Sequence, residues 1–122
     1  MGLDMYAFTT TGTPAQPVDF CAGENAARIH YWRKHPDLHG WMERLYRDKG
    51  GEQETFNCVN LQLTAGDLDS LEADVKQKRL PETNGFFFGQ SDGAELVDDL
   101  LFIAKAREAL AAKLTVFYTS WW

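Results

Sequence analysis

The residues best suited to chemistry lie in one short stretch, "IHYWRKHPDLHGWMERLYR", residues 29–47. It holds all three histidines, His30, His35 and His39, with two of the four tryptophans, two of the four tyrosines and four of the twelve basic residues. Imidazole groups can transfer protons or bind a metal, whereas tyrosine, tryptophan and arginine often dominate contacts between proteins. The stretch therefore predicts either a histidine site or a docking surface.

A metal site would use His35 and His39, which are four residues apart and could face one ion from adjacent helical turns. No Glu follows His35 as the zinc-protease motif requires, and no third ligand lies nearby in the chain. Asp4 or the pair Asp98-Asp99 could supply a carboxylate only through the fold. We therefore expect no metal and no cofactor, and a small metal- or histidine-dependent enzyme stays as the alternative.

Other catalytic signatures are missing from the sequence. There is no Gly-x-Ser-x-Gly turn, and the glycines of "KGG", "AGD", "NGFFFG" and "SDG" have no nucleotide-binding spacing. A nucleophilic pairing of Cys58 with a histidine would depend wholly on the tertiary fold. Function without catalysis is therefore favoured over an enzyme, and no small-molecule substrate is indicated.

The docking interpretation centres on "HYWRKH", residues 30–35. In an extended segment Tyr31 and Arg33 face one way, and His30, Trp32 and Lys34 face the other. Tyrosine and tryptophan bring a large contact area at little cost in side-chain entropy, which suits a binding surface. The alternative is that Tyr31 or Trp32 packs under a sheet while Arg33 pairs with the protein's own carboxylates.

The phenylalanine segment "GFFFG", residues 85–89, is a second candidate for binding. Either Phe86 and Phe88 fill the core and leave Phe87 outside, or all three form a lid between glycine hinges. The predicted binding residues are thus Tyr31, Trp32, Arg33, Lys34, His35, His39 and Phe87.

The charge distribution restricts the partner. Residues 28–49 carry a net charge of +3, and the other hundred residues carry −9, within a chain total of −6. An acidic surface repels phosphates, so DNA and RNA are disfavoured as partners. A nucleic-acid-binding module remains the second alternative, and it would use the local basic residues Arg28, Arg33, Lys34, Arg44 and Arg47.

The lack of a targeting signal in the sequence and the spacing of its cysteines predict a cytoplasmic protein with no membrane partner. No apolar run approaches the ~20 residues that a helical membrane span needs, and the N-terminal segment lacks a basic region followed by an apolar block. Cys21 and Cys58 have neither metal-binding nor redox spacing, so we expect both to be reduced thiols.

The expected fold is a single α+β domain over residues 1–122, with a small, mainly antiparallel sheet covered by three helices in the order β-α-β-α-α-β. Alternation or β-branched composition predicts strands at 2–10, 55–64 and 114–122, and we read the chain as extended from Ile29. Apolar spacing predicts helices at 36–48, 64–79 and from Ser91 to 113.

The local sequence also predicts details of the first two helices. Proline suits the first helical position, so His35 should be the N-cap of the helix that begins at Pro36. The apolar spacing places Trp41 in the core, His39 on the flank and Gly40 on the outer face. Thr64 and Asp67 have the spacing of a capping box for the next helix.

Several motifs together carry a resemblance that spans nearly the whole chain: "MGLDMY" (1–6), "HYWRKH" (30–35), "LHGW" (38–41), "LP" (80–81), "GFFFG" (85–89) and the terminal "YTSWW". This combination resembles a small protein family of phages and prophages that has no established function. Members are often labelled phosphoglycerate kinase, yet 122 residues without a nucleotide-phosphate loop are too few for that two-domain enzyme.

The resemblance implies a phage accessory protein that acts in the bacterial cytoplasm by stoichiometric binding to a host protein or protein complex. Counter-defence, such as inhibition of a CRISPR effector, is one role that it implies. The tail departs from the family's Ser-Ser-Trp by reading Thr119-Ser120-Trp121 with an added Trp122, and His35-Pro36 is unusual for the family.

Overall fold

The computed structural model describes residues 3–12, 14, 16–20, 26–33, 35–80 and 96–121. Its elements are β1 (Asp4–Thr10), β2 (Ala27–Arg33), α1 (Pro36–Asp48), β3 (Leu61–Leu63), α2 (Ala65–Lys76), α3 (Leu96–Ala111) and β4 (Thr115–Trp121). The predicted α+β class is confirmed, as is the order β-α-β-α-α-β of the predicted strands and helices, and the segment read as extended from Ile29 adds β2 between β1 and α1. Ser91, the predicted start of the last helix, lies outside the described residues.

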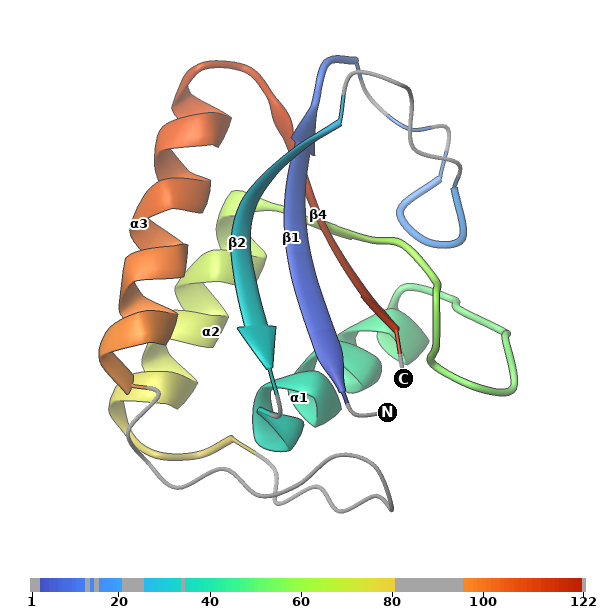
Figure 1. Ribbon diagram of the computed structural model, residues 1–122, viewed down its shortest axis with the longest axis horizontal. Coiled ribbons are helices and arrows are strands. Elements are labelled where there is room, and N and C mark those ends of the chain that lie inside the picture. Colours follow the sequence, from blue (N-terminus) through green and yellow to red (C-terminus); the bar gives the residue numbers. More distant parts are fainter. Residues whose placement is uncertain are drawn as a thin grey trace.

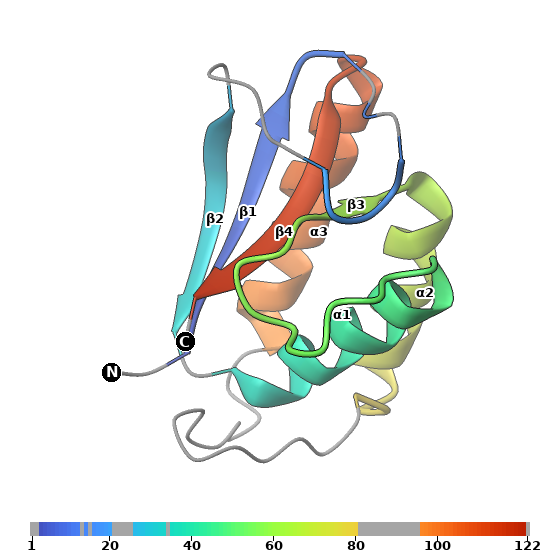
Figure 2. The same ribbon diagram turned by 90° about the vertical axis from the view of Figure 1, so that its right-hand side faces the viewer.

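The four strands form one antiparallel sheet in the order β2-β1-β4-β3, and β1 and β4 are its central strands. All three helices lie on the same side of this sheet, which gives a two-layer arrangement (Figures 1 and 2). The outer edge of β3 is covered, since Val18 bridges Leu61 and the Gln62 amide donates to the Pro17 carbonyl (2.9 Å). The edge of β2 carries no such strand in the part of the chain that is described.

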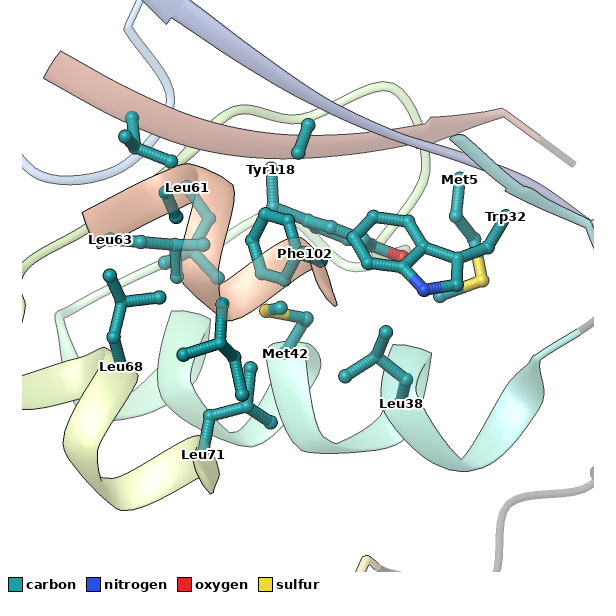
Figure 3. Close-up of a cluster of buried hydrophobic side chains, with 14 of the residues drawn as sticks. Met5, Trp32, Leu38, Met42, Leu61, Leu63, Leu68, Leu71, Phe102 and Tyr118 are labelled. Atoms are coloured by element: carbon teal, nitrogen blue, oxygen red, sulfur yellow. The ribbon is translucent and has the colours of Figure 1, made fainter. Parts of the chain in front are cut away.

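The core lies between the sheet and the helices because each central strand turns one set of alternate residues inward. On β1 these are Met5 and Ala7, which are fully buried. The indole of Trp32 and the rings of Phe102 and Tyr118 meet them among the leucines of the helices (Figure 3). Burial of apolar side chains of this size contributes about 1.5–3 kcal/mol each, so this layer is the main source of stability.

Helix α1 begins and ends where the sequence predicts, at Pro36 and Asp48, with His35 as its N-cap residue. The predicted flank position of His39 and outer position of Gly40 are wrong, because both residues are buried. The segment after the helix folds back under it, and the ring of Phe56 lies 4.9 Å from the His39 ring. Trp41 is only partly buried at the edge of the core.

The other boundaries differ in ways that the backbone explains. The strand predicted at 55–64 is confined to Leu61–Leu63, and within the predicted range Cys58 has φ +60°, which is incompatible with an extended run through it. Cys58 is a free, exposed thiol, and Cys21 lies outside the described residues. The capping box predicted for α2 is present: the Thr64 hydroxyl accepts from the Asp67 amide, and Asp67 accepts from the Thr64 amide. None of the described helices is long and apolar enough to traverse a bilayer.

Candidate functional site

Strand β2 divides the predicted binding block between its two faces. Tyr31 is 41% exposed and Arg33 is exposed, whereas Trp32 is only 3% exposed and His30 is also buried. The predicted alternation of these four side chains is therefore confirmed. Lys34, like Phe87, lies outside the described residues.

The exposed residues of β2 belong to a larger surface, the side of the sheet opposite the helices. We call it the outer sheet face, and it comprises Asp4, Tyr6, Phe8, Arg28, Tyr31, Arg33, Phe117, Thr119 and Trp121. Cross-strand pairing arranges them in three rows: Arg33, Asp4 and Trp121; then Tyr31, Tyr6 and Thr119; then Arg28, Phe8 and Phe117. None of the helices that the structure describes covers this face (Figure 2).

Aromatic rings form a continuous band across the outer sheet face. The Tyr6 ring lies 5.3 Å from Tyr31 and 6.0 Å from Phe8, centroid to centroid. Phe8 stacks on Phe117 at 5.5 Å, and the Phe20 ring packs edge-on against Phe117 at 5.4 Å, so the Phe117 end of the band is buried. Trp121, in the neighbouring row, is 66% exposed. Exposed aromatic area of this kind is typical of a protein interface rather than of a solvated sheet.

A β-bulge adds a positive charge to this face. The register of β2 against β1 shifts between Ala7 and Phe8, which pair with His30 and Arg28, so Ile29 is the extra residue. Simple alternation would turn Arg28 inward with His30. The bulge instead brings Arg28 to the outer face, where its guanidinium lies 5.7 Å from the centre of the Tyr31 ring.

The exposed charged groups of the outer sheet face are the guanidinium groups of Arg28 and Arg33. The Tyr31 hydroxyl donates to the Asp4 carboxylate (2.7 Å), and this hydrogen bond raises the pKa of Tyr31. Arg28 and Arg33 form no ion pair with any described residue. The one carboxylate on the face thus accepts from Tyr31, and neither guanidinium group is paired with a described carboxylate.

Two other predicted site residues, Trp32 and His35, meet inside the protein at a single carboxylate. The Trp32 indole N–H donates to Asp99 Oδ1 (3.1 Å), and His35 Nε2 lies 2.9 Å from Asp99 Oδ2. Both residues and Asp99 are buried, so the expectation that Trp32 and His35 belong to an accessible binding surface is wrong. The carboxylate lies in the first turn of α3, where the helix dipole also favours a negative charge.

His39 belongs to a separate buried pair, so the expected exposed role is wrong for it too. Its Nδ1 lies 2.7 Å from the Tyr118 hydroxyl, and the ring also hydrogen-bonds the Phe56 backbone. Burial lowers the pKa of His39 to about 4 and raises the pKa of Tyr118 well above its ordinary value. The imidazole is therefore neutral near pH 7, with Nδ1 as the acceptor for the Tyr118 hydroxyl.

The third histidine also has its own carboxylate. His30 Nε2 lies 3.1 Å from the half-exposed Asp98 carboxylate without a well-aligned hydrogen bond, and Lys105 lies 3.3 Å from His30 Nδ1. The three histidines thus have three different partners and share no site. Within the described ranges, no group of three or more His, Cys, Asp or Glu side chains is arranged to hold a metal ion.

A cleft of about 280 Å³ lies between α1 and α2 and is lined mainly by Trp41, Arg44, Asp67, Ser70, Asp74 and Arg79. Two of its acidic groups, Asp67 and Asp74, are already used by the protein. Asp74 accepts from the Trp41 indole (2.8 Å) and from Arg79 (3.1 Å), and Asp67 accepts from Lys49 and the Thr64 amide.

Most of the outer sheet face was not predicted as a site. Tyr6 and Phe8 alternate with the buried apolar residues of β1, so they point to the opposite face of the sheet. The sequence contains this alternation. Their meeting with Trp121 depends on the pairing of β1 with β4, and the position of Arg28 depends on the bulge. Neither can be read from local spacing.

A scan against protein-family models, a search of curated proteins and a search of solved structures each return no match. What the chain does is therefore inferred from the chemistry of the outer sheet face.

Proposed function

We propose that this chain is a binding protein that acts stoichiometrically on a macromolecular partner, with the outer sheet face as its docking surface. The observation that carries the proposal is the continuous band of aromatic rings, with two arginines beside it, on the sheet face that the described helices leave uncovered. Exposed tyrosine and tryptophan next to arginine match the composition of interface hot spots.

The histidines support binding over catalysis. His35 and His39 are buried in hydrogen bonds that join structural elements, so neither faces solvent beside the outer sheet face. A general acid or base must come within hydrogen-bond reach of its substrate. The interior role of these imidazoles favours a protein that recognises a partner by surface contacts.

The finer proposal concerns the origin and the partner. Three of the stretches that resemble phage and prophage proteins lie side by side in the sheet, since Asp4, Arg33 and Trp121 form one cross-strand row. We propose a phage or prophage accessory protein whose partner is a host protein or complex in the bacterial cytoplasm. Counter-defence, including inhibition of a CRISPR effector, is the role that the resemblance implies for it.

Quantitative affinity capture from bacterial lysate tests the proposal. The test variant is Tyr31→Ala with Trp121→Ala, which removes two exposed rings from the outer sheet face. The matched control is Val97→Ala with Leu101→Ala, which removes two exposed apolar side chains from α3 on the other side of the sheet. We expect a partner captured by the wild type and the control and lost with the test variant. Equal capture by both variants would refute the outer sheet face as the docking surface.

A further inference from the structure

The geometry points to the kind of partner that the outer sheet face takes: an extended protein segment with two carboxylates four residues apart and an apolar side chain midway between them. This inference rests on the proposed function and adds the chemistry of the partner to it. The segment lies along β2, where its carboxylates meet Arg28 and Arg33 and its apolar side chain meets the rings of Tyr31 and Tyr6.

The charge of the partner follows from the two arginines. The chain carries 18 acidic and 12 basic residues, so a surplus of carboxylates is available for internal ion pairs. Five other described cations use it: Arg47 pairs with Glu43, Lys49 with Asp67, Lys76 with Glu72, Arg79 with Asp74, and Arg107 with Asp69 and Glu72. Arg28 and Arg33 stay exposed and have no carboxylate partner among the described residues. Guanidinium groups left in this way fit carboxylates of another molecule.

The spacing of the partner's charges follows from the register. Arg33 and Arg28 pair with Asp4 and Phe8 of β1, which are four residues apart, so the two arginines are about 13 Å apart along the strand at 3.3 Å per residue. In an extended segment, residues i, i+2 and i+4 face one side. Carboxylates at i and i+4 therefore match the two arginines, and the side chain at i+2 lies opposite Tyr31.

The position along β2 follows from the edges of the sheet. The β3 edge is covered by residues 17–20, whereas the β2 edge is open in the described structure. The Ile29 carbonyl at the bulge already accepts from Lys105 (3.2 Å). A partner strand could therefore not form an unbroken row of backbone hydrogen bonds with the edge of β2. Recognition thus depends on the side chains of the face, above all on the two arginines and the tyrosine between them.

Charge favours a protein over a nucleic acid as the anionic partner. Two arginines can neutralise only two phosphates, and affinity for a strand grows with the number of phosphates neutralised. Since the whole chain carries −6, the chain without these two arginines carries −8, which repels the rest of a polyanionic backbone. A short acidic segment with one apolar side chain avoids this repulsion.

Three synthetic probes test the inference by calorimetry and by NMR shift mapping on the full chain. The first is a nine-residue peptide with glutamates four residues apart around a central phenylalanine, the second has lysines in place of the glutamates, and the third is an oligothymidylate of nine nucleotides. We expect saturable binding of the first alone, with shifts at Arg28, Tyr31 and Arg33. Arg28→Glu with Arg33→Glu should weaken it about tenfold or more. The control, Arg44→Glu on α1, should bind as the wild type does.

Four results would overturn the inference: no binding of the glutamate peptide, equal binding of the lysine peptide, tighter binding of the oligonucleotide, or self-association of the chain through the same face. Circular dichroism checks that the variants fold. If the variant with both arginines changed to glutamate does not fold, Arg28→Gln with Arg33→Gln is the milder replacement. Failure here is distinct from failure of the proposed function. If lysate capture depends on Tyr31 and Trp121 but not on the two arginines, the docking surface stands and the acidic partner is wrong.

Discussion

The carboxylate of Asp99 connects α3 with β2 and with the start of α1, because each of its two oxygens contacts a different partner. It lies in the first turn of α3, accepts from the Trp32 indole near the end of β2, and lies 2.9 Å from the imidazole of His35, the residue before α1. A buried carboxylate is costly unless hydrogen bonds replace its hydration, and here Trp32 and His35 supply them. These two residues therefore hold the end of β2 against the helices, which fixes the position of Tyr31 and Arg33 on the opposite face.

Replacement of Asp99 should be far more costly than replacement of its neighbour. Asp99→Ala removes the acceptor of two buried donors, so we expect a loss of about 3 kcal/mol in the free energy of unfolding. Asp98→Ala is the matched control, because its contact with His30 is half exposed and its loss should cost under about 1 kcal/mol. Urea unfolding of both variants measures the difference, and equal costs would contradict the assigned role of Asp99.

His39 should make the stability of the protein depend on pH in the acid range. The pKa of His39 is about 4 in the folded chain and 6.5 in the unfolded chain, so the unfolded chain binds more protons between these values. The contribution of the neutral ring is complete above pH 6.5 and is lost as the pH falls towards 4. From pH 7 to pH 5 it should fall by about 2 kcal/mol.

The variant His39→Gln isolates this effect. Glutamine can still hydrogen-bond Tyr118 but does not titrate, so its unfolding free energy should decline less than that of the wild type between pH 7 and pH 5. Urea unfolding of both proteins at the two pH values gives the comparison. The same decline in both would show that carboxylates, rather than His39, set the pH dependence.

At the scale of elements, local signals predicted most of the secondary structure. The His35-Pro36 pair marked the start of α1, and the spacing of Thr64 and Asp67 marked the start of α2, because both depend only on neighbouring residues. The late start of β3, at Leu61, was not predictable in this way.

The site was less predictable than the elements because its parts meet through pairing. The sequence correctly separates the outward Tyr31 and Arg33 from the inward Trp32, which needs only the period of a strand. It does not reveal that His39 contacts Tyr118, seventy-nine positions away, or that Asp99 binds Trp32. Such long-range partners depend on the tertiary fold.

The capping box of α2 gives a prediction at this scale. Thr64→Ala removes the hydroxyl that accepts from the Asp67 amide, so the free energy of unfolding should fall by about 1 kcal/mol. Thr64→Ser keeps the acceptor and should be close to the wild type. Thermal unfolding monitored by circular dichroism measures both, and a neutral alanine variant would show that the cap adds nothing to the packed helix.

The whole molecule has two unlike faces. The three helices cover one side of the sheet (Figures 1 and 2) and enclose the core. The other side carries aromatic rings and two arginines that form no ion pair with a described residue. On the helix side, buried hydrogen bonds of Trp32 and His35 with Asp99, and of His39 with Tyr118, connect the sheet to the helices. The described helices thus leave uncovered the face that we propose as the docking surface.

Hydroxyl-radical footprinting of the free protein and of its captured complex tests this division most directly, because it reports the exposure of individual side chains without mutation. In the free protein Tyr31 and Trp121 should react and Trp32 should not. In the complex we predict that Tyr31 and Trp121 become protected while Val97 and Leu101, exposed on α3, react as before. Protection of Val97 and Leu101 with Tyr31 and Trp121 unchanged would contradict the account.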